Sequence, residues 1–229
     1  MYCSRCLMLL LVLSGSLATA ADNQLSEAEK QQGWILLFNG KTLDGWVTSK
    51  KKPSQRPIEE GSINPHKSGH YMMIHEKKWE NFVLRLDFKI SQGCNSGIFF
   101  RTSSLQPRAG KDVGFNGIEI AIDDTATAGY HDTGAIYDLV KPRVNAMKPA
   151  DQWNELKLFC NRNLISVSIN GKRVSRMDTN QFSEPNKRPD GSDHKFDVVY
   201  KSHPRLGYIG LQDHGADCWY KNIKLKVLQ

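Results

Sequence analysis

Residues 82–90 read FVLRLDFKI, and this stretch decides the fold class. Large apolar side chains occupy every second position from Phe82 to Ile90, and Arg85, Asp87 and Lys89 stand between them. An apolar period of two is the signature of a β-strand that buries one of its faces. The stretch therefore predicts a half-buried strand.

The same alternation recurs further along the chain. Residues 156–160 and 165–169 alternate in this way on either side of a short polar turn. The dipeptide Asn170-Gly171 then marks a tight hairpin into residues 172–177, because both turn positions must tolerate positive φ. Three adjacent antiparallel strands are expected here.

The rest of the chain also reads as strands. Residues 208–212 and 219–227 alternate, and the first strand, 34–38, is expected to lie near the last one. About a dozen short strands without a long amphipathic helix predict an all-β fold of two packed antiparallel sheets, a jelly-roll sandwich. The polar stretch 180–203 is expected to be a long surface loop of this domain.

Residues 1–20 read as an export signal. Arg5 precedes a short apolar run and a small-residue end, so cleavage is expected near Ala20. The run is too short for a membrane span, which needs about 20 apolar residues. We expect a secreted or periplasmic protein without a membrane span, made of a polar lead-in over 21–32 and one jelly-roll domain over 33–229.

Charge and cysteine usage exclude several classes of function. The net charge of +7 comes from scattered basic residues, whereas nucleic-acid binding needs them clustered on one face. Only Cys94, Cys160 and Cys218 follow the signal, so a zinc site or a disulfide scaffold is not expected, although one disulfide is possible. The motifs of serine hydrolases, zinc proteases and nucleotidases do not occur in the sequence.

Candidate site residues begin on the strand expected around residues 116–124. Glu119 and Asp123 flank Ala121 on the face opposite the isoleucines. Carboxylates accept hydrogen bonds from sugar hydroxyls, and the small alanine leaves room for a ring. An exposed strand face with ordinary surface charges is the alternative interpretation.

Other segments offer partners for these carboxylates. Arg101 ends an apolar strand, where it could anchor an oxygen-rich ligand or simply pair with a carboxylate. Gln212 and His214 share one strand face, and His131 lies in a loop of the kind that often carries catalytic groups. The side-chain parity of three strands predicts that five residues converge on one concave sheet face: Glu119, Asp123, Arg101, Gln212 and His214.

Six short sequence blocks are spread, in a fixed order, over nearly all of the chain that follows the signal. They are LFNGKTLDGW at 37–46, NSGIFFR at 95–101, GIEI at 117–120, GAIY at 134–137, WNE at 153–155 and IGLQDHG at 209–215. Together they resemble the 3-keto-disaccharide hydrolase domain family. The resemblance implies a concanavalin A-like jelly roll and a role in cleaving glycosides that are already oxidised at C3.

The chemistry implied by the resemblance is an elimination. A ketone at C3 acidifies the C2 hydrogen, so a base can remove that proton and the enolate can expel the C1 substituent. Water can then add across the double bond. The site requires a base, an electrophile facing the oxyanion and an acid for the leaving oxygen.

The residues receive roles on this basis. We assign Glu119 as the base. Arg101, with help from His131, is expected to stabilise the enolate, and His214 or Asp123 is expected to act as the acid. A divalent metal held by carboxylate and imidazole could replace the arginine. Three residues are expected to orient hydroxyls: Asn95, Tyr137 and Gln212.

Three hypotheses remain open at this point. The first is a 3-keto-glycoside hydrolase or lyase, acting on an oxidised oligosaccharide or glycoside and functionally linked to a sugar 3-oxidase. The second is a non-catalytic carbohydrate-binding module of the same fold. The third is a conventional glycosidase using Glu119 and Asp123, whose parallel side chains would struggle to flank a glycosidic bond.

Overall fold

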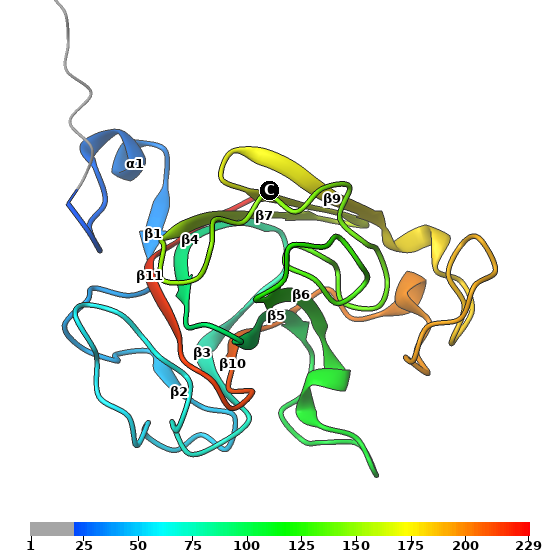
Figure 1. Ribbon diagram of the computed structural model, residues 1–229, viewed down its shortest axis with the longest axis horizontal. Coiled ribbons are helices and arrows are strands. Elements are labelled where there is room, and N and C mark those ends of the chain that lie inside the picture. The colour runs from blue at the N-terminus through cyan, green and yellow to red at the C-terminus, as the bar shows by residue number, and fades with distance from the viewer. Residues whose placement is uncertain (1–20) are drawn as a thin grey trace, which may run out of the picture.

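The structure, a computed structural model, describes residues 21–229, and the predicted export signal over 1–20 lies outside the described residues. Two antiparallel sheets pack face to face (Figure 1). The six-stranded sheet contains, in spatial order, β1 (Trp34–Leu36), β11 (Cys218–Val227), β4 (Phe82–Ile90), β7 (Asn154–Asn161), β8 (Leu164–Ile169) and β9 (Lys172–Asp178). The five-stranded sheet contains β2 (Trp46–Thr48), β3 (Met72–Trp79), β10 (Gly207–Gln212), β5 (Asn95–Thr102) and β6 (Ile118–Asp123). The predicted two-sheet antiparallel sandwich is confirmed.

The helices of the described chain are short. Ser26 begins α1 (Glu27–Gln31) with a capping box, in which its side chain accepts from the Glu29 amide and the Glu29 carboxylate accepts from the Ser26 amide. Three 3-10 turns follow: η1 (Val113–Asn116), η2 (Thr179–Gln181) and η3 (Tyr200–Ser202). Among residues 21–229, no helix has the length and apolar character needed to cross a membrane.

The main core lies between the two sheets, as the alternation predicts. The five apolar side chains of β4 at even positions from Phe82 to Ile90 are at most 1% exposed. The isoleucines of β6 and the apolar side chains of β7 and β8 fill the same layer. Fully burying one such side chain stabilises the fold by about 1.5–3 kcal/mol, so this layer fixes which face of every strand points inward.

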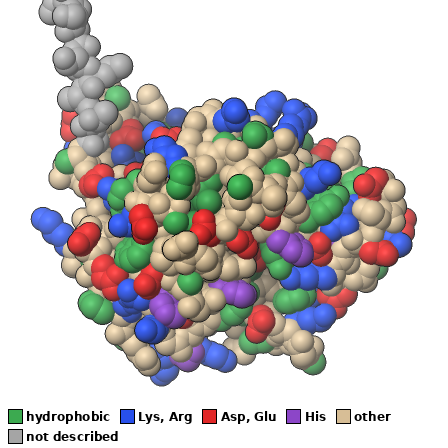
Figure 2. Space-filling view, in the orientation of Figure 1, with side chains coloured by type: hydrophobic (Ala, Val, Ile, Leu, Met, Phe, Trp, Pro, Cys, Tyr) green, Lys and Arg blue, Asp and Glu red, His purple; other side chains and the backbone are tan. Residues whose placement is uncertain are grey.

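The predicted strand neighbours are also present. The order β7-β8-β9 forms two successive hairpins, and Asn170 and Gly171 at the second turn have φ of 49° and 77°. Trp34 of β1 pairs with Lys226 of β11, so the first strand lies beside the last. Over the face seen in Figure 2, basic and acidic side chains are interspersed.

A second, smaller apolar cluster lies on the outer face of the five-stranded sheet. Its buried members are Met72, Ile74, Phe99 and Val113. The long connection between η2 and η3 folds toward this side, where Phe196 packs edge-on against Phe115 at 5.4 Å between ring centroids. The polar stretch 180–203 is therefore anchored by buried aromatic side chains, and it forms a wall beside the outer face.

Candidate active site

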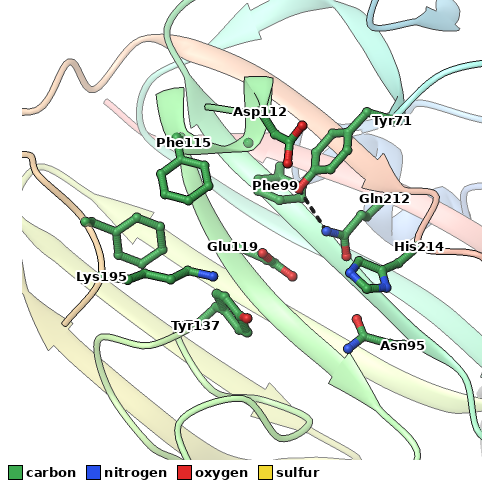
Figure 3. A pocket seen from close by; sticks show the side chains of 13 residues that line it. Tyr71, Asn95, Phe99, Asp112, Phe115, Glu119, Tyr137, Lys195, Gln212 and His214 are labelled. Carbon is green, nitrogen blue, oxygen red and sulfur yellow. Dashed lines mark hydrogen bonds between the residues drawn. The ribbon is translucent and has the colours of Figure 1, made fainter. Parts of the chain in front are cut away.

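A pocket opens on the outer face of the five-stranded sheet (Figure 3). Its side chains come from β5, β6, the end of β10, the η1 turn and the connections beside them. Its volume is about 140 Å³. That is below the roughly 300–1,000 Å³ of pockets for drug-sized ligands, and it suits a single sugar ring.

Most of the predicted site residues meet here. Five of the eight line the pocket: Asn95, Glu119, Tyr137, Gln212 and His214. Asp123 and His131 lie beside it, and Arg101 lies elsewhere. Of the five residues that side-chain parity predicted to converge, three line the pocket: Glu119, Gln212 and His214.

Glu119 occupies the centre of the pocket (Figure 3). Ile118 and Ile120 on either side of it point into the core, which turns its carboxylate outward. Burial raises the pKa of Glu119 to about 8, and the positive charge of Lys195 acts in the opposite direction. The described residues give this carboxylate no hydrogen-bond partner. It is therefore an acid–base group that titrates near neutral pH and is free to engage a ligand.

Gly97 leaves the space that the Glu119 carboxylate occupies. A Cβ atom at Gly97 would lie 2.3 Å from Oε1 of Glu119 and 2.8 Å from its Cδ. Such contacts are far inside van der Waals distance, so the carboxylate could not keep this position beside an alanine. Packing against the Glu119 carboxylate thus explains why the NSGIFFR block has a glycine at position 97.

Gln212 and Tyr71 form a hydrogen-bonded pair on one side of the pocket. Nε2 of Gln212 donates to the Tyr71 hydroxyl at 3.0 Å. Within the described chain, Oε1 of Gln212 is buried and has no partner. Burial and the nearby charge of Glu119 raise the pKa of Tyr71, so the phenol keeps its proton. Both side chains therefore retain groups that can bind a sugar hydroxyl or carbonyl.

Asn95 and Asp123 face each other at the pocket edge. They are directly paired across β5 and β6, and Nδ2 of Asn95 donates to Oδ2 of Asp123 at 3.3 Å. Burial and the charge of Asp132 raise the pKa of Asp123, while His214 and His131 lower it. Both histidines are thus close enough to Asp123 to influence its charge.

Asp138 links the loop that carries His131 to the loop that carries Lys195. Its carboxylate accepts from the backbone amide of Lys195 at 2.8 Å and from Nη2 of Arg188 at 2.7 Å. Nε2 of His131 lies 3.5 Å from the same carboxylate. The ring of Tyr137 contacts a side chain from each loop, since its centroid lies 4.6 Å from that of His131 and 4.1 Å from the Lys195 ammonium.

Arg101 does not lie in the pocket, and the prediction that it shares the open face with Glu119 is wrong. The register between β5 and β10 slips by one residue near the end of β5, and Arg101 there has φ of 53°. A bulge breaks the period of two. The side chain points instead toward the six-stranded sheet, where it donates to the carbonyl oxygen of Arg162 and is 2% exposed.

Several pocket residues could not be found from the sequence. Tyr71 directly precedes β3, and Lys195 lies in the long connection that we expected to be a plain surface loop. Phe115 and Phe196 form an aromatic wall. None of them belongs to an alternating pattern on the predicted site strands, so only the fold brings them to the pocket.

The spacing of the two strand carboxylates does not fit a conventional glycosidase. Asp123 stands four positions after Glu119 along β6, and a strand rises about 3.3 Å per residue, which gives about 13 Å between their Cα atoms. The catalytic carboxyl groups of glycosidases are about 5–9.5 Å apart. Within residues 21–229, no three His, Cys, Asp or Glu side chains are grouped so that they could hold a metal ion.

The fold and the pocket together define a class: a concanavalin A-like antiparallel sandwich with an acid-centred site on the outer face of one sheet. The chain belongs to the family described as the 3-keto-alpha-glucoside-1,2-lyase-like domain, whose model matches residues 33–226. The family resemblance predicted from the six sequence blocks is thereby confirmed. At the family level, the chain is a glycoside hydrolase-type enzyme.

Similar proteins agree with this assignment. A 3-keto-disaccharide hydrolase of Bacteroides thetaiotaomicron is 28% identical over 247 residues, which cover 94% of this chain and 85% of the relative. A crystal structure of a proposed glycosyl hydrolase from Parabacteroides distasonis is 29% identical, with a TM-score of 0.71 over 85% of this chain and 99% of the other. The exoplasmic/lumenal domain of VIP36 shares the fold alone, at 10% identity and a TM-score of 0.50 over 87% of this chain and 90% of its own.

Proposed function

We propose that this protein cleaves 3-keto-glycosides by removing the C2 proton and expelling the C1 substituent. The carrying observation is Glu119, a pocket carboxylate whose pKa is raised to about 8 and which has no hydrogen-bond partner within the described chain. A general base is most effective when its pKa is near the working pH. The family and the relative named a 3-keto-disaccharide hydrolase supply the substrate class.

The other pocket residues supply the remaining roles. Glu119 takes the C2 proton, and the negative charge that develops on the C3 oxygen is stabilised by the ammonium of Lys195 and the hydroxyl of Tyr71. Lys195 thus takes the role of enolate stabiliser that we expected of Arg101. His131 supports it, since both side chains contact the ring of Tyr137. His214, at the pocket edge, donates a proton to the leaving oxygen.

The cycle closes if water adds to the unsaturated intermediate. The water oxygen bonds to C1, and the proton that this water loses restores the proton donor His214. Glu119, whose carboxyl proton has exchanged with solvent, then protonates C2, which gives a 3-keto sugar and restores the carboxylate. Release before this addition would make the enzyme a lyase. Asp123 is the alternative acid, since it lies beside the histidines and its pKa is raised.

The substrate proposal follows from pocket size and polar lining. A pocket of about 140 Å³ takes one ring, so the enzyme acts on the oxidised terminal sugar of a disaccharide or glycoside. Asn95, Tyr137 and Gln212 orient its hydroxyls. We further propose that the protein works outside the cytoplasm, secreted or periplasmic, and downstream of an enzyme that oxidises sugars at C3.

The test compares 3-keto and unmodified forms of one disaccharide in heavy water. We expect cleavage of the keto form alone and incorporation of deuterium at C2, since abstraction exchanges that hydrogen whereas an oxocarbenium route leaves it untouched. Product that keeps its C2 hydrogen would refute the elimination. Cleavage of both forms would indicate a conventional glycosidase, and binding without cleavage would indicate a binding module.

Two variants sharpen the test. Glu119→Gln should abolish turnover while leaving binding largely intact, because the amide keeps the shape but cannot accept the proton. Glu155→Gln is the matched control, since Glu155 lies on β7 in the other sheet, with its side chain 46% exposed. Loss of binding alone in the first variant would make Glu119 a recognition residue.

A further inference from the structure

Two cysteines face each other across the sandwich, behind the pocket. Ser96 of β5 and Tyr220 of β11 touch through their hydroxyls at 2.9 Å. Two residues earlier on each chain segment, and therefore on the same faces, stand Cys94 and Cys218. Burial and, after it, the neighbouring Cys94 side chain raise the pKa of the Cys218 thiol, so the two side chains lie next to each other. Neither side chain reaches solvent, with exposures of 1% and 0%.

The backbone holds the two cysteines in this arrangement. Cys218 pairs directly with Ile90 at the end of β4. The chain then turns, with the Ser91 amide donating to the Asp217 carbonyl at 3.0 Å and the Cys94 amide donating to the Ser91 carbonyl at 3.2 Å. The turn thus returns Cys94 to the start of β11, although 123 residues separate it from Cys218 in the sequence.

We propose that Cys94 and Cys218 are a redox-modification site and form a disulfide when the protein folds in an oxidising compartment. Two S–H bonds are lost and one S–S bond forms. The two electrons and two protons pass to a disulfide-bearing oxidant, such as a thiol–disulfide oxidoreductase or glutathione disulfide.

The bond forms before the core closes. The thiolate is the attacking species in disulfide exchange. Burial raises the pKa of the Cys218 thiol in the folded protein, so the folded dithiol exchanges slowly. A disulfide at the same buried position also exchanges slowly, because an external thiolate cannot reach its sulfur atoms. The redox state acquired during folding is therefore retained.

The disulfide braces the pocket from behind. Cys94 directly precedes Asn95, and Cys218 begins β11 directly after the short connection that carries His214, so the bond ties together the two segments that bear these pocket residues. The Cys94 carbonyl also accepts from the Asp124 amide at 2.9 Å, next to Asp123. The inference does not depend on the reaction that the pocket performs.

Cys160 provides an internal control. It is also fully buried, with 0% exposure, and burial raises the pKa of its thiol to about 11. Within the described chain, the charged group that acts most strongly on its thiol, lowering the pKa, is Arg101, and no cysteine is among the causes of its shift. It should therefore remain a free thiol under the same conditions.

The decisive experiment maps thiols in the exported protein. The protein is denatured without reductant, alkylated, digested and analysed by mass spectrometry. We expect Cys160 to be alkylated and the peptides of Cys94 and Cys218 to be joined, with the join lost after reduction. Alkylation of all three cysteines, or a bond that involves Cys160, would overturn the proposal.

Thermal unfolding gives a second readout. The protein is first reduced under denaturing conditions and refolded, and its unfolding temperature is compared with that of the oxidised protein. Because the bond closes a loop of more than 100 residues, its loss should lower the unfolding temperature by roughly 10 °C. Cys160→Ala should keep this reductant effect, and Cys218→Ala should lose it. Equal unfolding temperatures for oxidised and reduced wild-type protein would contradict a stabilising role of the disulfide. The mass spectrum of the wild-type protein shows whether the disulfide exists, even if a variant fails to fold.

Discussion

The pH dependence of cleavage tests the role of Glu119 and of its neighbour Lys195. The pKa of Glu119 is raised to about 8, and only the deprotonated carboxylate can accept the C2 proton. The deprotonated fraction grows with pH, so kcat/KM for a 3-keto-glycoside should rise about tenfold from pH 6 to 7 and about fivefold from pH 7 to 8. It should level off near pH 9.

Lys195→Met should move this profile to higher pH. The lysine charge lowers the pKa of Glu119, so removing it raises the pKa further. A rise of half a unit would cost about threefold in kcat/KM at pH 7 through protonation alone, since each unit is a factor of ten. Lys195→Arg keeps the positive charge and should leave the midpoint near that of the wild type.

The assay is the initial rate of release of the C1 substituent from pH 6 to 9 at low substrate concentration. Low substrate matters because kcat/KM reports the pKa values of the free enzyme. A rate that stays flat over this range in the wild type would remove Glu119 from the role of base. A midpoint that does not move in Lys195→Met would mean that the two groups do not interact in the working enzyme.

Two further predictions concern residues that hold these groups in place. Gly97→Ala should lower kcat about a hundredfold. The new Cβ would meet Oε1 of Glu119 at 2.3 Å, and a displacement of the carboxylate by about 1 Å can cost that much. Unchanged kinetics would show that the carboxylate does not need the space beside Gly97. Asp138→Asn should loosen the Lys195 loop, lower kcat/KM about tenfold and move the pH midpoint upward, since the charged partner of Arg188 is lost. Asp190→Asn is a control in the same loop. The Asp190 side chain accepts hydrogen bonds from Ser192, and its substitution should leave the midpoint in place.

The alternation of side chains determined most of the fold. It predicted strand β4 and the three neighbouring strands β7, β8 and β9. It also placed Glu119 and Gln212 on the outer face of their strands. A period of two is a local property of an extended chain, and burial of one face fixes its direction, so these features follow from residue order alone.

Only the tertiary structure decided the remaining features of the site. The bulge before the end of β5 turns Arg101 toward the opposite sheet, and nothing in the apolar run GIFFR marks the slipped register. Lys195 reaches the pocket because a distant loop is anchored by Asp138 and by buried aromatic rings. The pKa of Glu119 is raised by burial, which depends on atoms from several elements at once. Register slips, loop anchoring and burial are long-range outcomes of packing, and a local sequence pattern carries no record of them.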